Sequence, residues 1–221
     1  MNVRWSAATL VLALGGPPLV AVASRYVVGN SGSIPRLLPF DLLLWAILGI
    51  VLTIVVKVER QGMDSIGCRP LHSSTFISAF VLICGINFVL NSVLMWCVKG
   101  LGAEGYEYGM TRILALPVWY RIFLAISAGT IEESLYRGYA IERLARLTGS
   151  MGTGALIAVV AFGAAHLPTW HLGPSVVFLV DGVAATLFYL WRRDLTALVI
   201  AHVIGDTIGL VVLPPGVGKL L

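Results

Sequence analysis

The amino-acid sequence predicts an all-α, multi-pass transmembrane helical bundle with about seven spans, in a range of roughly six to eight. Its composition is the first observation: 58% of the 221 residues are apolar, only 12% are charged, and the mean hydropathy is +0.91. A soluble domain has roughly 45–50% apolar and about 25% charged residues. The second observation is that the apolar residues gather into stretches that approach the roughly 20 residues needed to cross the hydrocarbon layer.

These apolar stretches follow one another along the whole chain and are separated by short polar segments. They cover Trp5–Val28, Leu37–Val56, Thr75–Val98, Ile113–Glu133, Gly152–Leu167, Ser175–Trp191 and Thr196–Leu213. We expect each of them to form a membrane-spanning helix.

The first stretch differs from the others because Gly15, Gly16, Pro17 and Pro18 interrupt it, and we expect the helix to break there. It ends in Ala21-Val-Ala23, which is similar to a signal-peptidase site, so a cleaved signal is an alternative to a first span. Cleavage before Ser24 would leave the orientation of the later spans unchanged.

The positive charges predict how the bundle is oriented. If the amino terminus is cytoplasmic, the segments on the cytoplasmic side (the inner segments) contain more Lys and Arg than the segments on the other side (the outer segments). This excess on the cytoplasmic side is usual in membrane proteins. The inner set is Arg4, Lys57, Arg60, Arg69, Arg143, Arg146, Arg192 and Arg193, and the outer set is Arg25, Arg36, Lys99, Arg112 and Lys219. The net charge of +4 therefore indicates a protein of the cell membrane and does not indicate nucleic-acid binding.

The polar piece Lys99–Arg112 is the best candidate for a domain boundary. It divides amino-terminal spans in residues 1–112 from a core in residues 113–213, and residues 214–221 form a short tail. The three cysteines have neither an even count nor a CxxC spacing, so no disulfide framework or zinc ribbon is predicted.

Ionisable residues inside the second half of the chain carry the functional prediction. A charge within a span costs about 2.5–3.5 kcal/mol on insertion scales, so its presence requires a reason. Glu133 and Arg137 are four residues apart and share a helix face, where they can pair, whereas Glu132 is rotated by about 100°. This spacing predicts that Arg137 neutralises Glu133 and leaves Glu132 free. The alternative is that the two glutamates only mark a membrane boundary.

Two histidines lie in later spans. His166 follows Phe162 by one turn, and His202 precedes Asp206 by one turn, so that each pair shares a helix face. Each pair also has a structural alternative. His166 could be a structural residue near a helix end whose hydrogen bonds are all made within the protein. His202 and Asp206 could form hydrogen bonds that hold two helices together. Gly205 and Gly209 form a GxxxG pattern that lets another helix approach closely. We interpret Asp41 and Asp181 as structural residues.

Together the three patterns Glu132-Glu133-x-x-x-Arg137, Phe162-x-x-x-His166 and His202-x-x-x-Asp206 resemble the ordered motifs of the CAAX protease and bacteriocin-processing (CPBP, or Abi) family. This family consists of intramembrane endopeptidases related to the type II CAAX prenyl proteases. The resemblance covers roughly residues 113–213, and the first three spans contribute only hydrophobicity to it.

The resemblance implies a role for each motif residue. Glu132 would be the base that activates a water with the help of His166, and His202 with Asp206 would face the developing oxyanion. Glu133, Arg137 and Phe162 would be supporting residues. The family often has Asn where this chain has Asp206. A protonated Asp206 could donate a hydrogen bond to the oxyanion, or an ionised Asp206 could orient His202.

The predicted function is therefore hydrolysis of a peptide bond in a membrane-associated protein or peptide, without a cofactor. A zinc-dependent version is the nearest alternative, with Glu132, His166 and His202 as ligands, although HExxH is absent. The sequence is also compatible with a non-enzymatic membrane scaffold or a proton-coupled transporter, since acids and histidines within spans also mark proton pathways. Expected partners are membrane lipid and the peptide substrate.

Overall fold

The protein is a bundle of long helices, and the described residues contain no strand. A computed structural model describes residues 3–29, 33–100 and 106–212. The helices are α1 (Val3–Val28), α2 (Ile34–Thr53), α3 (Ser73–Ile83), α4 (Asn91–Gly100), α5 (Tyr106–Leu114), α6 (Val118–Glu132), α7 (Ile141–Thr148), α8 (Met151–Trp170), α9 (Leu172–Arg192) and α10 (Leu195–Thr207). The all-α prediction is confirmed.

Short π-helical and 3-10 segments extend or connect these helices. The π-helical segments are η1 (Ile54–Val58), η3 (Cys84–Leu90), η4 (Glu133–Ala140) and η5 (Ile208–Val212), and η2 (Met63–Ile66) is a 3-10 turn. Because η4 joins α6 to α7 without a break, residues 118–148 form one continuous helix that carries the first motif. Single-turn π-helical insertions inside α-helices are frequent at functional sites.

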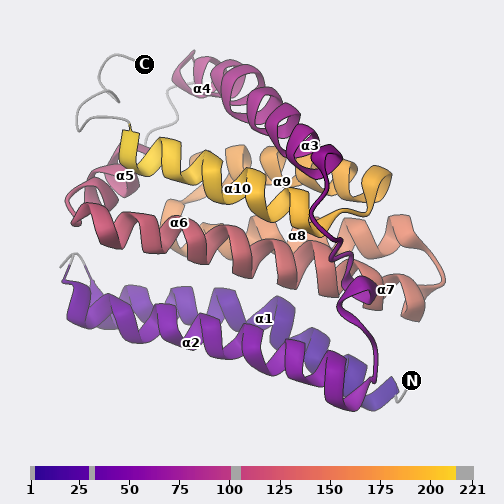
Figure 1. Ribbon diagram of the computed structural model, residues 1–221. Coiled ribbons are helices and arrows are strands. Elements are labelled where there is room, and N and C mark those ends of the chain that lie inside the picture. The colour runs from indigo at the N-terminus through magenta and orange to yellow at the C-terminus, as the bar shows by residue number, and fades with distance from the viewer. Residues whose placement is uncertain (1–2, 30–32, 101–105, 213–221) are drawn as a thin grey trace.

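The helices are arranged in layers (Figure 1). Helices α1 and α2 lie side by side, and α1 also packs against α8. In the middle of the bundle α6 contacts α10, and α8 contacts α9. The α3–η3–α4 helix crosses the bundle obliquely on the side away from α1, where α3 packs on α10 and α4 touches α9. The catalytic motifs predicted from the sequence thus lie on the three central helices α6–η4, α8 and α10.

Six helices are long and apolar enough to cross a membrane, among the residues that the structure describes. They cover Ser6–Val28, Ile34–Val58, Ser73–Leu94, Met151–Trp170, Leu172–Arg192 and Leu195–Val212. The chain is a multi-pass membrane protein, and six candidates agree with the lower end of the predicted range. The remaining predicted stretch, 113–133, contains the end of α5 and the whole of α6, and it is not among the six. It carries Arg121, Glu132 and Glu133.

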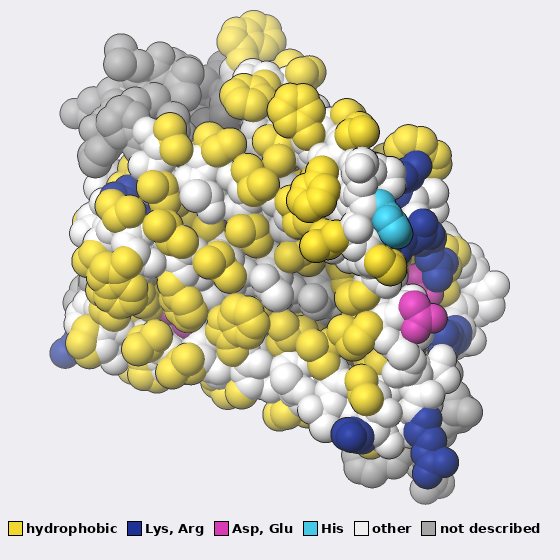
Figure 2. Space-filling model, in the orientation of Figure 1, with side chains coloured by type: hydrophobic (Ala, Val, Ile, Leu, Met, Phe, Trp, Pro, Cys, Tyr) yellow, Lys and Arg dark blue, Asp and Glu magenta, His cyan; other side chains and the backbone are white. Residues whose placement is uncertain are grey.

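The surface supports the same conclusion (Figure 2). Apolar side chains cover most of the face in view, and the Lys and Arg side chains gather at the edge where η2 and α7 lie. Large apolar side chains such as Phe80 and Trp96 on the α3–η3–α4 helix are more than half exposed. A belt of this kind is suited to contact with lipid chains, and the charged rim is suited to a membrane–water interface.

The expected break in the first helix is wrong. Helix α1 runs without interruption from Val3 to Val28 and includes Pro17 and Pro18. Backbone groups that lose their hydrogen bonds in lipid are costly, and neighbouring helices let a transmembrane helix tolerate Gly and Pro. Gly16 also allows α2 to approach closely, because a Cβ there would lie 3.0 Å from Cδ1 of Ile47.

The polar end of the bundle is held by ion pairs at the segment that joins α2 to α3 and at the end of α9. Arg143 of α7 contacts Glu59 at 2.7 Å and donates a hydrogen bond to the backbone oxygen of Ser65. Glu142 pairs with Arg193 at 2.6 Å. These contacts anchor the carboxyl-terminal end of the helix that begins with α6. The domain division predicted at Lys99–Arg112 stays a prediction, and residues 101–105 and the tail 214–221 lie outside the described part of the chain.

Candidate active site

One cavity of about 430 Å³ lies between the central helices, and the three motifs meet in it. The motif residues that line it are Glu132, Glu133, Arg137, Phe162, His166, His202 and Asp206. The structure therefore brings together every site residue that the sequence singles out, although the three helices are far apart in the chain. Most of the other lining side chains are apolar, and they come from α2, α3, α5, α6 and α9 as well.

Glu133 is the centre of the polar contacts in this cavity. Arg137 donates a hydrogen bond to its Oε1 at 3.1 Å, so the structure contains the pair that the four-residue spacing predicts. The same Oε1 lies 2.8 Å from Nδ1 of His202. Both Glu133 and Arg137 are only about 2% exposed. Glu133 thus connects the first motif to the third, a link that the sequence does not reveal because the two residues are 69 positions apart.

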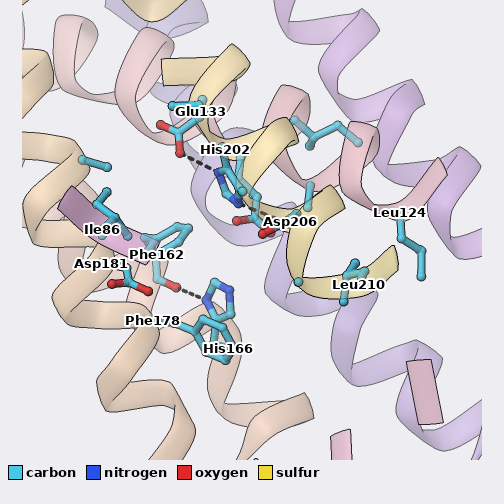
Figure 3. Close-up of a pocket in the computed structure, with 18 of the residues that line it drawn as sticks. Ile86, Leu124, Glu133, Phe162, His166, Phe178, Asp181, His202, Asp206 and Leu210 are labelled. Carbon is cyan, nitrogen blue, oxygen red and sulfur yellow. Dashed lines mark hydrogen bonds and ion pairs between the residues drawn. The ribbon is translucent and has the colours of Figure 1, made fainter. Parts of the chain in front are cut away.

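His202 is held between two carboxylates. Its Nδ1 faces Glu133 at 2.8 Å and its Nε2 lies 3.5 Å from Oδ2 of Asp206, one turn further along α10. Figure 3 shows this chain of polar contacts crossing the cavity above His166. When both ring nitrogens carry hydrogen, His202 has an N–H donor for each carboxylate, since an imidazolium is a donor at both positions. The ring orientation is therefore fixed from two sides.

His166 is oriented by its own helix and by aromatic rings. Its Nδ1 lies 2.9 Å from the backbone oxygen of Phe162. A carbonyl oxygen only accepts, so Nδ1 carries the hydrogen, and in the neutral ring Nε2 has the free lone pair. The ring packs between Phe162, at 4.6 Å between centroids, and Phe178, at 4.7 Å with an interplanar angle of 27°. These contacts leave Nε2 as the nitrogen available to a ligand.

Glu132 differs from Glu133 in its surroundings. It ends α6, is half-buried and lines the cavity. Within the part of the chain that the structure describes, its carboxylate makes no hydrogen bond or ion pair. The expectation of one neutralised and one free glutamate agrees with this geometry.

Phe162 connects the second motif to the first. The guanidinium of Arg137 lies 4.0 Å from the centre of the Phe162 ring, an arrangement typical of a cation–π contact. Arg137 also donates a hydrogen bond to the backbone oxygen of Gly182 on α9 at 3.2 Å. Gly182 has no room for a side chain, because a Cβ there would lie 2.7 Å from Phe162 and 3.1 Å from Nη2 of Arg137.

Replacing Gly182 with Ala should therefore destabilise the protein by about 1–3 kcal/mol, the usual cost of inserting a methyl group into a closely packed core. Unfolding of the purified protein in detergent measures the change. Gly15→Ala is the matched control, since a Cβ at Gly15 meets no atom within 4 Å. Equal stability of the two variants would show that the contact of α9 with Phe162 and Arg137 is looser than described.

Sequence reasoning misses several residues of the cavity. Asn87 and Asn91 line it from η3 and α4, and Phe178 and Asp181 line it from α9. The two asparagines are polar side chains within an apolar stretch, which is the signal that could have identified them. Asp181, interpreted from the sequence as a structural residue, lines the same cavity as the motif residues.

Two further expectations concern helix contacts near the cavity. Gly205 does allow close approach, because a Cβ there would lie 2.8 Å from Nδ2 of Asn87, whereas a Cβ at Gly209 would meet nothing within 4 Å. Among the described residues, a side chain would therefore meet another helix at the first glycine of the GxxxG pattern and not at the second. Asp41 lines the cavity and accepts a hydrogen bond from the hydroxyl of Tyr120, which joins α2 to α6.

The side chains do not fit a zinc site. Among the described residues, no three His, Cys, Asp or Glu side chains are grouped so that they could hold a metal ion. Glu132, His166 and His202, the ligands of the zinc-dependent alternative, line one cavity but are not arranged as a ligand set. The cysteines Cys68, Cys84 and Cys97 are free thiols.

Comparison with known proteins identifies one family. The family model described as type II CAAX prenyl endopeptidase Rce1-like matches residues 114–208, the part of the chain that contains all three motifs. No curated protein and no solved structure matches the chain.

Proposed function

Because residues 114–208 form an Rce1-like type II CAAX prenyl endopeptidase domain of the CPBP family, a family of peptidases, we propose that this membrane protein is an intramembrane endopeptidase. The observation that carries the proposal is the convergence of Glu132, His166 and His202 on one cavity among membrane-spanning helices. We propose that it hydrolyses a peptide bond in a membrane-associated protein or peptide.

In the proposed mechanism, Glu132 is the general base. Its carboxylate takes a proton from a water molecule while the water oxygen attacks the carbonyl carbon of the substrate. The free lone pair of His166 Nε2 accepts the second hydrogen of the same water and thereby orients it. The absence of a neutralising partner for Glu132 among the described residues supports this role. Glu132 then returns the proton to the leaving nitrogen as the C–N bond breaks.

His202 stabilises the negative charge that develops on the carbonyl oxygen. A fixed N–H donor is most effective when it is positioned before the reaction begins, and the contact of Nδ1 with Glu133 holds the ring in place. The 3.5 Å separation between Nε2 and Asp206 supports the second of the two roles considered for Asp206, in which its carboxylate orients His202. Since the contact of Nε2 with Asp206 is long, at 3.5 Å, the oxyanion shares this fixed Nε2–H when substrate binds.

Glu133 and Arg137 support this arrangement without contacting the substrate. Arg137 balances the charge of Glu133, and Glu133 fixes the ring of His202. Arg137 also touches Phe162, whose backbone oxygen orients His166. This pair thus positions both histidines at once.

The walls of the cavity indicate the substrate class. Apolar side chains, among them Leu82, Ile86 and Val177, make up most of its lining. An apolar substrate segment loses contact with water on binding there, which stabilises the complex by about 25 cal/mol per Å² buried. A lipid-modified or apolar peptide at the membrane fits this site. We propose that the polar end of the bundle, which contains the Arg143–Glu59 and Arg193–Glu142 pairs, faces the cytoplasm.

The experiment that tests the function uses the full chain in liposomes. A farnesylated peptide that ends in a CAAX sequence is added together with an apolar transmembrane peptide, and the products are identified by mass spectrometry. We expect the wild-type protein to cleave at least one of the two peptides and the Glu132→Gln protein to cleave neither. Equal products from both proteins would contradict the proposal.

A further inference from the structure

Helix α9 contributes residues to the cavity that none of the three motifs contains. Phe178 stacks on the ring of His166, and the backbone oxygen of Gly182 accepts a hydrogen bond from Arg137. Asp181 lies between these two fixed points and lines the cavity. Since α9 is held on both sides of Asp181, the carboxylate has a defined position in the cavity, and Figure 3 shows it beside Phe162 and above His166 and Phe178.

The partner of Asp181 is an amide group from another helix. With its nitrogen turned toward the carboxylate, the Asn91 side chain donates to Oδ1 of Asp181 at 2.9 Å and to Oδ2 at 3.0 Å. Asn91 is the first residue of α4 and lines the same cavity. The chain therefore places one of its own carboxamides against an acceptor in the proposed active site.

The helix that carries Asn91 has few buried side chains around this point. The side chains of Phe88, Val89 and Val93 are more than half exposed, and none of the residues of η3 is buried. A segment with few buried apolar contacts opens at a low free-energy cost. One turn before Asn91, by contrast, Asn87 packs closely on Gly205 of α10. The Asn91 amide can thus leave Asp181 while the earlier part of the helix stays in contact with α10.

From this geometry we infer that Asp181 binds the peptide backbone of the substrate. A carboxamide N–H and a peptide N–H are the same kind of donor, and a carboxylate is a strong acceptor for either. A backbone N–H of the substrate replaces the Asn91 amide, and the peptide is thereby aligned past His166. This inference rests on the proposed peptidase function and deepens it, because it names the group of the substrate that α9 recognises.

The first test removes single N–H donors from the ligand. Binding of a fluorescent farnesylated CAAX peptide, and of analogues that are N-methylated at one backbone nitrogen each, is measured by fluorescence anisotropy. The protein is the full-length Glu132→Gln variant, which does not turn the peptide over. We expect one analogue to bind about tenfold more weakly than the parent peptide, since a hydrogen bond to a charged group is lost.

The Asp181 variants assign that loss to one carboxylate. The N-methyl penalty is the factor by which the weakly binding analogue binds more weakly than the parent peptide. In the Asp181→Asn protein this penalty should fall to about threefold, because a neutral acceptor forms a hydrogen bond of roughly half the strength. In the Asp181→Ala protein it should disappear. The matched control is Asp64→Asn, the same change at an exposed residue, and there the tenfold penalty should remain. A full penalty in both Asp181 variants would overturn the inference.

A second test separates substrate binding from a structural latch. If the Asn91 amide competes with the substrate, Asn91→Ala should tighten binding of the parent peptide, whereas Asp181→Ala should weaken it. If the Asn91–Asp181 contact only holds α4 against α9, both variants should bind the peptide more weakly. This outcome would also overturn the inference. Unfolding measurements in detergent show that each variant is folded before its affinity is compared.

The two proposals fail in different ways. If the wild-type protein cleaves the peptide but the N-methyl penalty is unchanged in the Asp181 variants, only the proposed role of Asp181 is contradicted, and the peptidase function is not. The expected binding pattern without any cleavage by the wild-type protein would support the backbone site and contradict the peptidase function. No binding of any peptide in the series would contradict both.

Discussion

Glu132→Gln is expected to lower the rate of peptide cleavage by about 10²- to 10⁴-fold, the usual contribution of a general base. Glutamine has nearly the same shape as glutamate, but its amide cannot take a proton from water. The carboxylate of Glu132 has no ion-pair partner within the described residues, so the substitution should leave the stability nearly unchanged. The measurement is the single-turnover rate for the farnesylated peptide in liposomes.

Asp64→Asn is the control for this prediction, since it makes the same chemical change at an exposed position outside the cavity. We expect it to cleave at the wild-type rate. A Glu132→Gln protein that retains more than about a tenth of the wild-type rate would remove Glu132 from the role of base, because general bases contribute at least about 10²-fold.

Arg137→Met should have the largest effect on stability. Glu133 is 2% exposed, and the substitution would leave its carboxylate buried without its cation. Removing one partner of a buried ion pair typically costs about 3–5 kcal/mol. The free energy of unfolding in detergent measures this loss, and activity should fall with it, because Glu133 would no longer hold His202 in a fixed orientation.

The double variant Glu133→Gln with Arg137→Met distinguishes an uncompensated charge from a general loss of packing. It should recover most of the stability, since no unpaired charge remains, but little of the activity. Arg60→Met, at an exposed position outside the cavity, is the matched control and should be close to the wild type in stability. A double variant as unstable as Arg137→Met would assign the loss to the contact of Arg137 with Phe162 instead.

The spans and the Glu133–Arg137 pair could be predicted from the sequence because both depend on local patterns. A stretch of about 20 apolar residues identifies a span wherever it packs, and residues four apart share a helix face. The contact between Glu133 and His202 depends instead on how two helices rotate against each other. The family resemblance assigns both residues to one site, but only the structure shows which atoms meet.

The role of α9 could not be predicted for a similar reason. Asp181 is an isolated acid in its own span, and its partner Asn91 lies 90 positions earlier in an uncharged stretch. The break expected in α1 is wrong because Gly and Pro interrupt helices in water more readily than in lipid, where every backbone group needs a partner. The π-helical form of η4 has no sequence signal that we recognise.

Among the described residues, the buried pairs Glu133–Arg137 and Glu59–Arg143 have different consequences for the biosynthesis of the protein. Glu133 and Arg137 belong to one turn of a single helix, so they can neutralise each other while the insertion machinery still holds that helix. Glu59 and Arg143 are 84 positions apart, and their charges meet only after the later helix has been synthesised. Until then Glu59 must remain hydrated at the membrane surface, which makes the closing of this second pair a late step in assembly.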